Sequence, residues 1–305
     1  MQLRIVHDTS YAYAPAVVTA QHLAHLRPLD LPDQRTLSHR LHISPLPHEY
    51  REHTDAFGNV LCFFTLESPH HVLSVRADSL LDIRPPRSIH ALASPPWEQV
   101  REQFRYQVGT PFDPASIFTF ASPFVPRSPI LIDFAYPVFA PGIPLLWAAQ
   151  ALMNRIHTEM TYASGSTGIY TPALDALAQR RGVCQDFAHI MIACLRSLGL
   201  PARYVSGYLL TQPPPGQARL MGADASHAWV QVYVPDVGWV DFDPTNNRSG
   251  WGRPGEDYAT LALGRDFGDV SPLRGVIQGG GHPHLSVAVT VAPPQEWPTN
   301  DPIPH

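Results

Sequence analysis

The chain has 305 residues, of which 44% are hydrophobic and 15% charged, a composition that excludes an intrinsically disordered protein. Its formal net charge of -5 shows no excess of basic residues, so nucleic acid and anionic lipid are disfavoured as partners. A chain of this length buries a sizeable core and favours two domains over one.

Sequence features also bear on the compartment. The N-terminus, MQLRIVHDTSYAYAP, lacks the basic start, apolar stretch and small-residue cleavage site of a secretory signal. No run approaches the roughly 18 apolar residues of a transmembrane helix. Three cysteines in a chain of this length do not make a disulfide framework. We therefore expect a cytoplasmic protein with no membrane partner.

The first part of the chain has the pattern of β-strands. Residues 3–13, 36–45, 58–66 and 71–83 alternate between apolar and polar side chains, with turn signals such as DAFGN between them. Residues 84–97 are dense in proline and small residues, which is typical of a connection between domains. We predict a β-rich N-terminal domain over 1–90, followed by a second region over 91–305.

The second region begins with helices. Residues 145–160 have a helical pattern. Thr171 is placed as an N-cap, with Pro172 at the first position of a short helix that ends at Gly182. The next helix begins at or near Cys184 and stops at Gly199.

Strands follow these helices. The pattern predicts them at 202–210, 227–235, 239–245 and 284–292, before a proline-rich tail. The long loop 211–226 lies between the first two of these strands.

Cys184 is set apart from the other two cysteines by its position at a helix N-terminus. On a helical wheel it shares an apolar face with Ala188, Met191 and Leu195, which predicts a buried helix with the thiol at its tip. Free N–H groups and the positive end of the helix dipole stabilise a thiolate there and can hold an oxyanion. Cys62 and Cys194 lie in apolar runs and are interpreted as small buried hydrophobic residues.

A cysteine nucleophile needs a base and a group that orients the base. His227 lies on the polar and aromatic face of its strand, and the following strand carries Asp241 and Asp243 on one face. If Tyr233 pairs with Trp239, His227 and Asp243 become diagonal neighbours on one face. A slip of one residue would separate them. We expect this polar face to pack against the tip of the Cys184 helix.

Three segments together resemble a known family. GVCQDFAHIMIACLRSLGLPARYVSGYL, DASHAWVQVYVPDVGWVDFDP and GRDFGDVSPLRGVIQGGG are similar to the bacterial transglutaminase-like proteins, many of which are named as cysteine proteases. The first 84 residues, with YAY, LRPLD and DAFGNV, resemble the β-rich region that precedes that core.

The resemblance implies both a fold and a reaction. The fold is α+β: a β-rich N-terminal domain, then a papain-like core with the cysteine on a central helix packed on an antiparallel sheet. Cys184 is the implied nucleophile, His227 the base and Asp243 its partner, with Asp241 as the fallback. The implied reaction is acyl transfer through a thioester, on a peptide or protein amide, with no metal or organic cofactor.

Other interpretations remain open. A metal site at CQDFAH is disfavoured, because His189 and Asp186 lie about 140° and 200° from Cys184 on the wheel. These two residues are interpreted as a structural pair that braces the sheet. The alternative to an enzyme is a non-catalytic scaffold that binds a peptide or a partner protein. A side-chain oxyanion donor is unassigned, since Gln185 points about 100° away from Cys184 and Trp147 is only a loose candidate.

Overall fold

A long N-terminal strand, β1 (Gln2–Ala24), organises the first of two sheets. The computed structural model describes residues 1–86, 94–109, 111–212, 221–222 and 224–297. The main strand order is β2-β5-β1-β4-β3. Strands β13 and β14 lie off this path, and each of them also pairs with β1. The other strands of this sheet are β2 (Gln34–Ser44), β3 (Glu49–Thr54), β4 (Val60–Leu66), β5 (His70–Ile83), β13 (Leu273–Gly279) and β14 (His284–Ala292).

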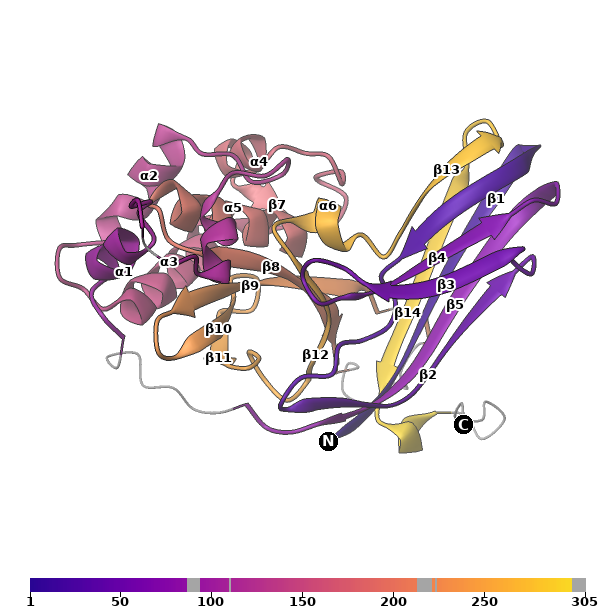
Figure 1. Cartoon of the computed structure of the whole chain (residues 1–305), viewed down its shortest axis with the longest axis horizontal. Helices are drawn as coiled ribbons and strands as arrows, with labels where there is room; N and C mark the ends of the chain where they lie inside the picture. Colours follow the sequence, from indigo (N-terminus) through magenta and orange to yellow (C-terminus); the bar gives the residue numbers. More distant parts are fainter. Residues whose placement is uncertain (87–93, 110, 213–220, 223, 298–305) are drawn as a thin grey trace.

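The second sheet is antiparallel and carries the helices. Its order is β11-β10-β9-β8-β12, with bounds β8 (Ala202–Leu209), β9 (Ser226–Val234), β10 (Gly238–Asp243), β11 (Arg248–Trp251) and β12 (Tyr258–Gly264). The helices cover one side of it, as Figure 1 shows. They are α1 (Trp97–Gln103), α2 (Pro129–Ala135), α3 (Leu145–Glu159), α4 (Ala173–Gln179) and α5 (Cys184–Ser197).

Short elements complete the chain. A parallel pair, β6 (Thr161–Tyr162) and β7 (Arg181–Gly182), precedes α5. Helix α6 (Phe267–Val270) follows β12, and 3-10 turns lie at η2 (Pro114–Thr119), η3 (Tyr136–Val138) and η4 (Pro294–Glu296).

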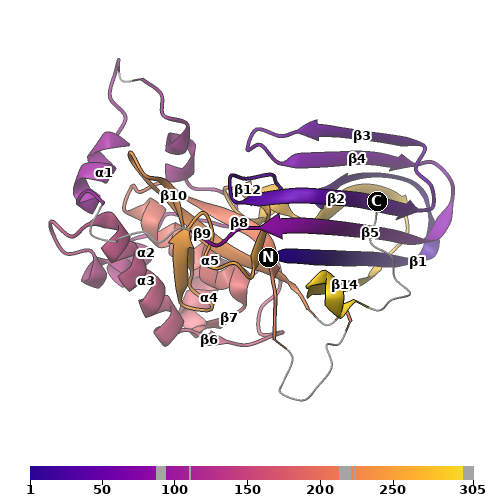
Figure 2. The same ribbon diagram turned by 90° about the horizontal axis from the view of Figure 1, so that it is seen from below.

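Buried amides join the two sheets. The side chain of Gln34 donates to the carbonyl of Thr260 and accepts from its N–H, and Asn59 does the same at Leu263. These four bonds lie along β12, the edge strand of the second sheet, so the first sheet satisfies backbone groups that an open edge would leave unpaired. In Figure 2 the strands of the first sheet run side by side, away from the helices.

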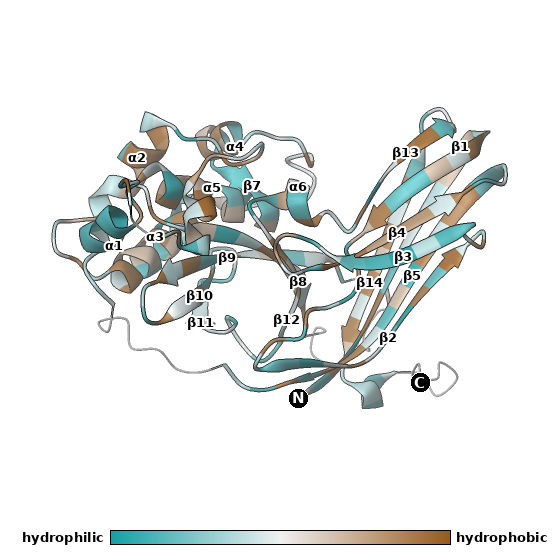
Figure 3. Cartoon of the chain, in the orientation of Figure 1, coloured by the Kyte–Doolittle hydropathy of each residue, from teal (hydrophilic) through white to brown (hydrophobic). Residues whose placement is uncertain are grey.

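This arrangement confirms the predicted α+β class, with a β-rich N-terminal part and a helix-bearing antiparallel sheet. Along the first sheet, hydrophilic and hydrophobic segments mix within single strands (Figure 3), and in β5 the buried residues Leu73, Val75 and Ala77 recur at every second position. The C-terminal strand β14 belongs to the first sheet, whereas the boundary between 90 and 91 stays a prediction. Among the described residues, no helix is long and apolar enough to cross a bilayer.

Several local predictions need correction. Pro172, and not Thr171, is the N-cap of α4, because the Thr171 hydroxyl accepts the N–H of Gly168 instead. The helix ends at Gln179, two residues before β7. The sequence patterns also missed β3, β11, β12 and β13. Within the predicted connection 84–97 and the loop 211–226, residues 87–93, 213–220 and 223 lie outside the described part.

Candidate active site

Cys184 is the first residue of α5, as predicted. The preceding residue, Val183, is extended, and its N–H donates to the Asp186 carboxylate at 2.8 Å. The same carboxylate oxygen accepts the hydroxyl of Thr167 at 2.7 Å. A methyl group at Gly182 would lie 2.6 Å from this oxygen, so glycine is needed at the corner. Asp186 therefore closes the turn that presents the thiol.

Helix α5 is buried on every side rather than along one apolar stripe. Asp186, His189 and Arg196 are as inaccessible as Ala188 and the rest of the apolar stripe. His189 accepts the N–H of Phe267 at its Nε2, and burial lowers its pKa to about 3. Asp186 and His189 are both structural, but they bind separate partners, so the prediction that they form a pair is wrong.

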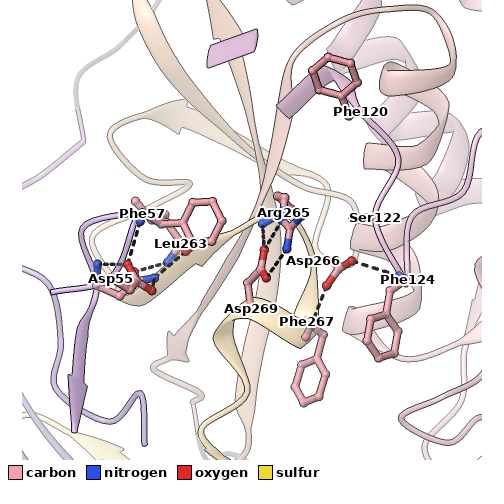
Figure 4. Close-up of polar contacts among 12 residues, drawn as sticks. Asp55, Phe57, Phe120, Ser122, Phe124, Leu263, Arg265, Asp266, Phe267 and Asp269 are labelled. Atoms are coloured by element: carbon pink, nitrogen blue, oxygen red, sulfur yellow. Dashed lines mark hydrogen bonds and ion pairs between the residues drawn. The ribbon is translucent and has the colours of Figure 1, made fainter. Parts of the chain in front are cut away.

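The segment GRDFGD forms the corner that covers His189. Asp266 accepts the N–H groups of Phe124 and Gly268, and Arg265 pairs with Asp269 at 2.8 Å (Figure 4). Arg196 of α5 donates to the carbonyl of Arg265 at 2.7 Å. These contacts fix α6 against α5, which gives this motif a structural role behind the cysteine helix.

The hairpin of β9 and β10 has the register that the sequence predicted. Tyr233 pairs with Trp239 and Gln231 with Asp241. Nε2 of His227 lies 2.7 Å from Oδ2 of Asp243. The two predicted residues are therefore in direct contact.

Asp243 is fully buried and receives several hydrogen bonds. Its Oδ2 also accepts the Tyr258 hydroxyl and the Asn246 side-chain amide, both at 2.7 Å, and its Oδ1 accepts the N–H of Thr245. Burial alone would raise the pKa of Asp243, but the hydrogen bonds from His227, Tyr258 and Asn246 outweigh it and lower that pKa. The carboxylate is thus held ionised beside the imidazole.

Cys184 lies close enough to the ring of His227 to raise its pKa. Because Nε2 faces Asp243, Nδ1 is the ring nitrogen left for the sulfur. Burial lowers the pKa of His227, but its interactions with Asp243 and Cys184 outweigh that effect and raise the pKa to about 10. The residues that raise the pKa of His227 are therefore the two that the sequence singled out with it.

Asp241, the alternative partner predicted for His227, makes hydrogen bonds to other residues. Its Oδ1 accepts the indole N–H of Trp229 at 2.7 Å and the amide of Gln231 at 2.9 Å. Burial raises its pKa to about 7. No described hydrogen bond joins Asp241 to His227, so it cannot orient the ring directly.

The predicted packing of the polar face of β9 is wrong except at His227. The alternate residues Ala228, Val230 and Val232 join the core that contains α5. Trp229 packs on the other side, with Leu29 and Tyr258. His227 reaches Cys184 because it lies at the beginning of the strand, beside the helix tip.

Tyr162 is a neighbour of Cys184 that sequence reasoning missed. It lies on β6 opposite Gly182, and its ring centre is 6.5 Å from that of Phe187, one turn after Cys184. Burial and the charge of Cys184 raise the pKa of Tyr162, so its hydroxyl keeps its proton. A two-residue strand gives no pattern in the sequence, so nothing indicated this residue.

The two earlier candidates for an oxyanion donor are placed differently. The Gln185 amide donates to the carbonyl of Ile169 at 2.9 Å, and Trp147 lies half exposed in a groove of α3. Cys62 and Cys194 are free and buried, and burial raises the pKa of Cys62 to about 11. The described residues contain no group of three or more histidine, cysteine, aspartate or glutamate side chains able to hold a metal ion.

Comparisons with known proteins place the chain in a family. Residues 134–244 match the transglutaminase-like superfamily, and residues 3–82 match the bacterial transglutaminase-like N-terminal region. The chain therefore belongs to the transglutaminase-like superfamily, as the sequence motifs indicated. The matched core contains Cys184, His227 and Asp243.

Relatives and one solved structure extend this assignment. An uncharacterized protein of Mycobacterium tuberculosis is 38% identical over 298 residues, which cover 95% of this chain and 92% of that protein. A Pseudomonas aeruginosa protein-glutamine gamma-glutamyltransferase is 37% identical over 102 residues, 31% of this chain and 15% of that protein. The crystal structure of a proposed cysteine protease from Cytophaga hutchinsonii has a TM-score of 0.70 at 23% identity, covering 96% of this chain and 90% of that chain, and it shows a shared fold.

Proposed function

We propose that the protein is a cysteine-dependent amide hydrolase or acyl transferase that acts through a thioester on Cys184. The observation that carries this proposal is the contact of His227 with Asp243, 2.7 Å from Nε2 to Oδ2, beside a thiol at Cys184 that also raises the pKa of the ring. In this proposal His227 takes the proton of the Cys184 thiol, which gives a thiolate paired with an imidazolium. This is the protonation state in which sulfur is a nucleophile.

The first half of the reaction forms the thioester. The Cys184 thiolate attacks the amide carbonyl carbon, and the carbonyl oxygen becomes an oxyanion. The backbone N–H of Cys184, at the first position of α5, has no hydrogen-bond acceptor among the described residues and is available to this oxyanion. The Tyr162 hydroxyl is the second donor in this proposal. The His227 imidazolium then gives its proton to the leaving nitrogen as the C–N bond breaks, and ammonia or an amine departs.

The second half releases the acyl group. Neutral His227 takes a proton from water, or from a primary amine, as that nucleophile attacks the thioester carbon. The C–S bond breaks and restores the thiolate and the imidazolium. Asp243 keeps Nε2 protonated through both halves, so that Nδ1 is the nitrogen that exchanges protons. We expect water to be favoured over an amine as the acceptor.

The test is a panel of peptides and glutamine amides, incubated with and without a primary amine. Ammonia or amine release should depend on Cys184 and vanish in Cys184→Ala, and a product that contains the added amine would identify transfer. Release that is unchanged in Cys184→Ala would refute the proposal. Alkylation of Cys184 by iodoacetamide no faster than that of a free thiol would instead favour a non-catalytic scaffold.

A further inference from the structure

A groove beside the candidate active site carries a second proposal. It has a volume of about 380 Å³ and is lined by Trp147, Gln150, Ala151, Asn154 and Asn247. The first four residues form one stripe along α3, since they follow the i, i+3, i+4, i+7 spacing of a helix face. Asn247 comes from the turn after β10. We call this feature the α3 groove.

The turn that supplies Asn247 also supports Asp243, the carboxylate that orients His227. Asn246, the preceding residue, donates its side-chain amide to Asp243 at 2.7 Å. His157 of α3 lies 3.0 Å from the carbonyl of Thr245, and Asn247 donates to Asn154 at 3.2 Å. The turn is therefore fastened to α3, and the α3 groove begins one residue away from the contact that holds Asp243.

The lining of the α3 groove is polar but uncharged. Its three primary amides carry both donors and acceptors, and none of the five lining residues has an ionisable side chain. The bond from Asn247 to Asn154 uses one N–H of Asn247 and the carbonyl of Asn154. The amide N–H groups of Asn154 and the carbonyl of Asn247 remain, so a donor and an acceptor lie side by side.

An exposed indole adds a flat surface. Trp147 is 55% exposed, although it belongs to a helix whose neighbouring residues Leu145, Leu146 and Ala148 are buried. Asn247 has a left-handed backbone with φ of 52°, a conformation that asparagine adopts more readily than most residues. A planar group that both donates and accepts matches this surface. Among the five lining residues a carboxylate would meet no cation, and an ammonium would meet no carboxylate.

We propose that the α3 groove is a specificity subsite for an uncharged carboxamide side chain, of glutamine or asparagine, that flanks the reacting amide of the substrate. This inference rests on the proposed function, because it places the subsite beside the residues that would cleave the amide. The carboxamide stacks on Trp147, accepts from Asn154 and donates to Asn247.

Binding can be measured without turnover. Isotope-labelled Cys184→Ala protein would be titrated with blocked glutamine, N-acetylglutamine methylamide, and with its glutamate counterpart, followed by NMR. We expect shifts at the Trp147 indole and at the side-chain amides of Asn154 and Asn247, with the glutamate compound at least ten-fold weaker. Asn154→Asp keeps the size of the side chain but replaces the donor to the bound carboxamide with a charged acceptor, and it should weaken glutamine binding at least ten-fold. The same charge change at exposed Gln99 of α1, Gln99→Glu, should leave binding unchanged.

Turnover provides the second arm. In the wild type, a peptide with glutamine beside the reacting amide should have kcat/KM at least ten-fold above its glutamate partner, and Asn154→Asp should lower the value for the glutamine peptide at least ten-fold. Cys184-dependent turnover with equal rates for both peptides would overturn the subsite and leave the proposed function intact. Specific shifts in the α3 groove without turnover of any substrate would support the subsite and refute the proposed function. Shifts confined to other surfaces, or equal affinity for both blocked residues, would also overturn the subsite.

Discussion

Replacing Asp243 with asparagine tests the central contact most directly. The change keeps the size of the side chain and its acceptor oxygen but removes the charge beside Nε2 of His227. The amide can also turn its NH₂ toward the ring, which would favour the wrong tautomer of the imidazole. We expect His227 to lose its proton at a much lower pH and the enzyme to lose most of its activity.

The magnitude follows from the pKa of His227. The difference between 6.5 and about 10 corresponds to roughly 5 kcal/mol of preference for the imidazolium, which the interactions with Asp243 and Cys184 provide against the cost of burial. With Asp243 as the stronger contributor, Asp243→Asn should lower the titration midpoint of His227 by at least about 1 pH unit. The kcat/KM for amide cleavage should fall by about 10²–10⁴.

NMR titration of the His227 ring measures the midpoint, and the pH profile of Cys184 alkylation measures the ion pair. Asp241→Asn is the matched control, because Asp241 is equally buried on the same strand but binds Trp229 and Gln231. It should leave the His227 midpoint within about 0.3 pH unit. An unchanged midpoint in Asp243→Asn, or a larger effect in Asp241→Asn, would refute the reasoning.

Three further substitutions test other parts of the site. Tyr162→Phe should lower kcat for amide cleavage by about 10–100-fold with little change in KM, and Tyr162→Trp, which restores an N–H donor, should recover part of the loss in the same steady-state assay. Gly182→Ala places a methyl group 2.6 Å from the Asp186 carboxylate and should cost about 1–3 kcal/mol in urea unfolding, whereas Gly168→Ala, with open space around it, should cost far less. Burial lowers the pKa of His189 to about 3, so below pH 6.5 the unfolded chain binds a proton at this residue that the folded chain does not bind. The free energy of unfolding therefore decreases as the pH falls. Between pH 6 and 4 the wild type should therefore lose about 2 kcal/mol more than His189→Gln, and equal losses would count against a neutral buried imidazole.

The sequence predicted the hairpin of β9 and β10 because local patterns determine it. Alternation along 227–234 and 239–243 selects one register, and a one-residue slip would place polar side chains in the aliphatic layer. The pairing of Tyr233 with Trp239 then follows, and with it the contact of His227 and Asp243. The sequence also predicted where α5 begins, because residues that start and stop a helix flank this segment.

Other features depend on contacts that no local pattern contains. The partner of His189 is the backbone of Phe267, 78 residues away, so the helical wheel could not find it. Strand β12 is buried at all seven positions and lacks alternation, while β3 is exposed and charged, so neither resembles a half-buried strand. Thr171 precedes a proline in the way an N-cap does, yet its hydroxyl closes the turn that begins at Gly168.

The position of the imidazole depends on a glycine on the neighbouring strand. Gly207 of β8 pairs with His227, and a methyl group there would collide with the ring of Trp229 and the carbonyl of Ala259. The indole of Trp229 therefore lies over Gly207, and it stacks on the His227 ring with centres 6.1 Å apart. The first sheet supports the same strand, since His7 of β1 lies 2.9 Å from the hydroxyl of the next residue, Tyr208. Because β1 contacts β8, and β8 pairs with the strand that carries His227, the N-terminal sheet belongs to the framework of the site and is more than a neighbouring module.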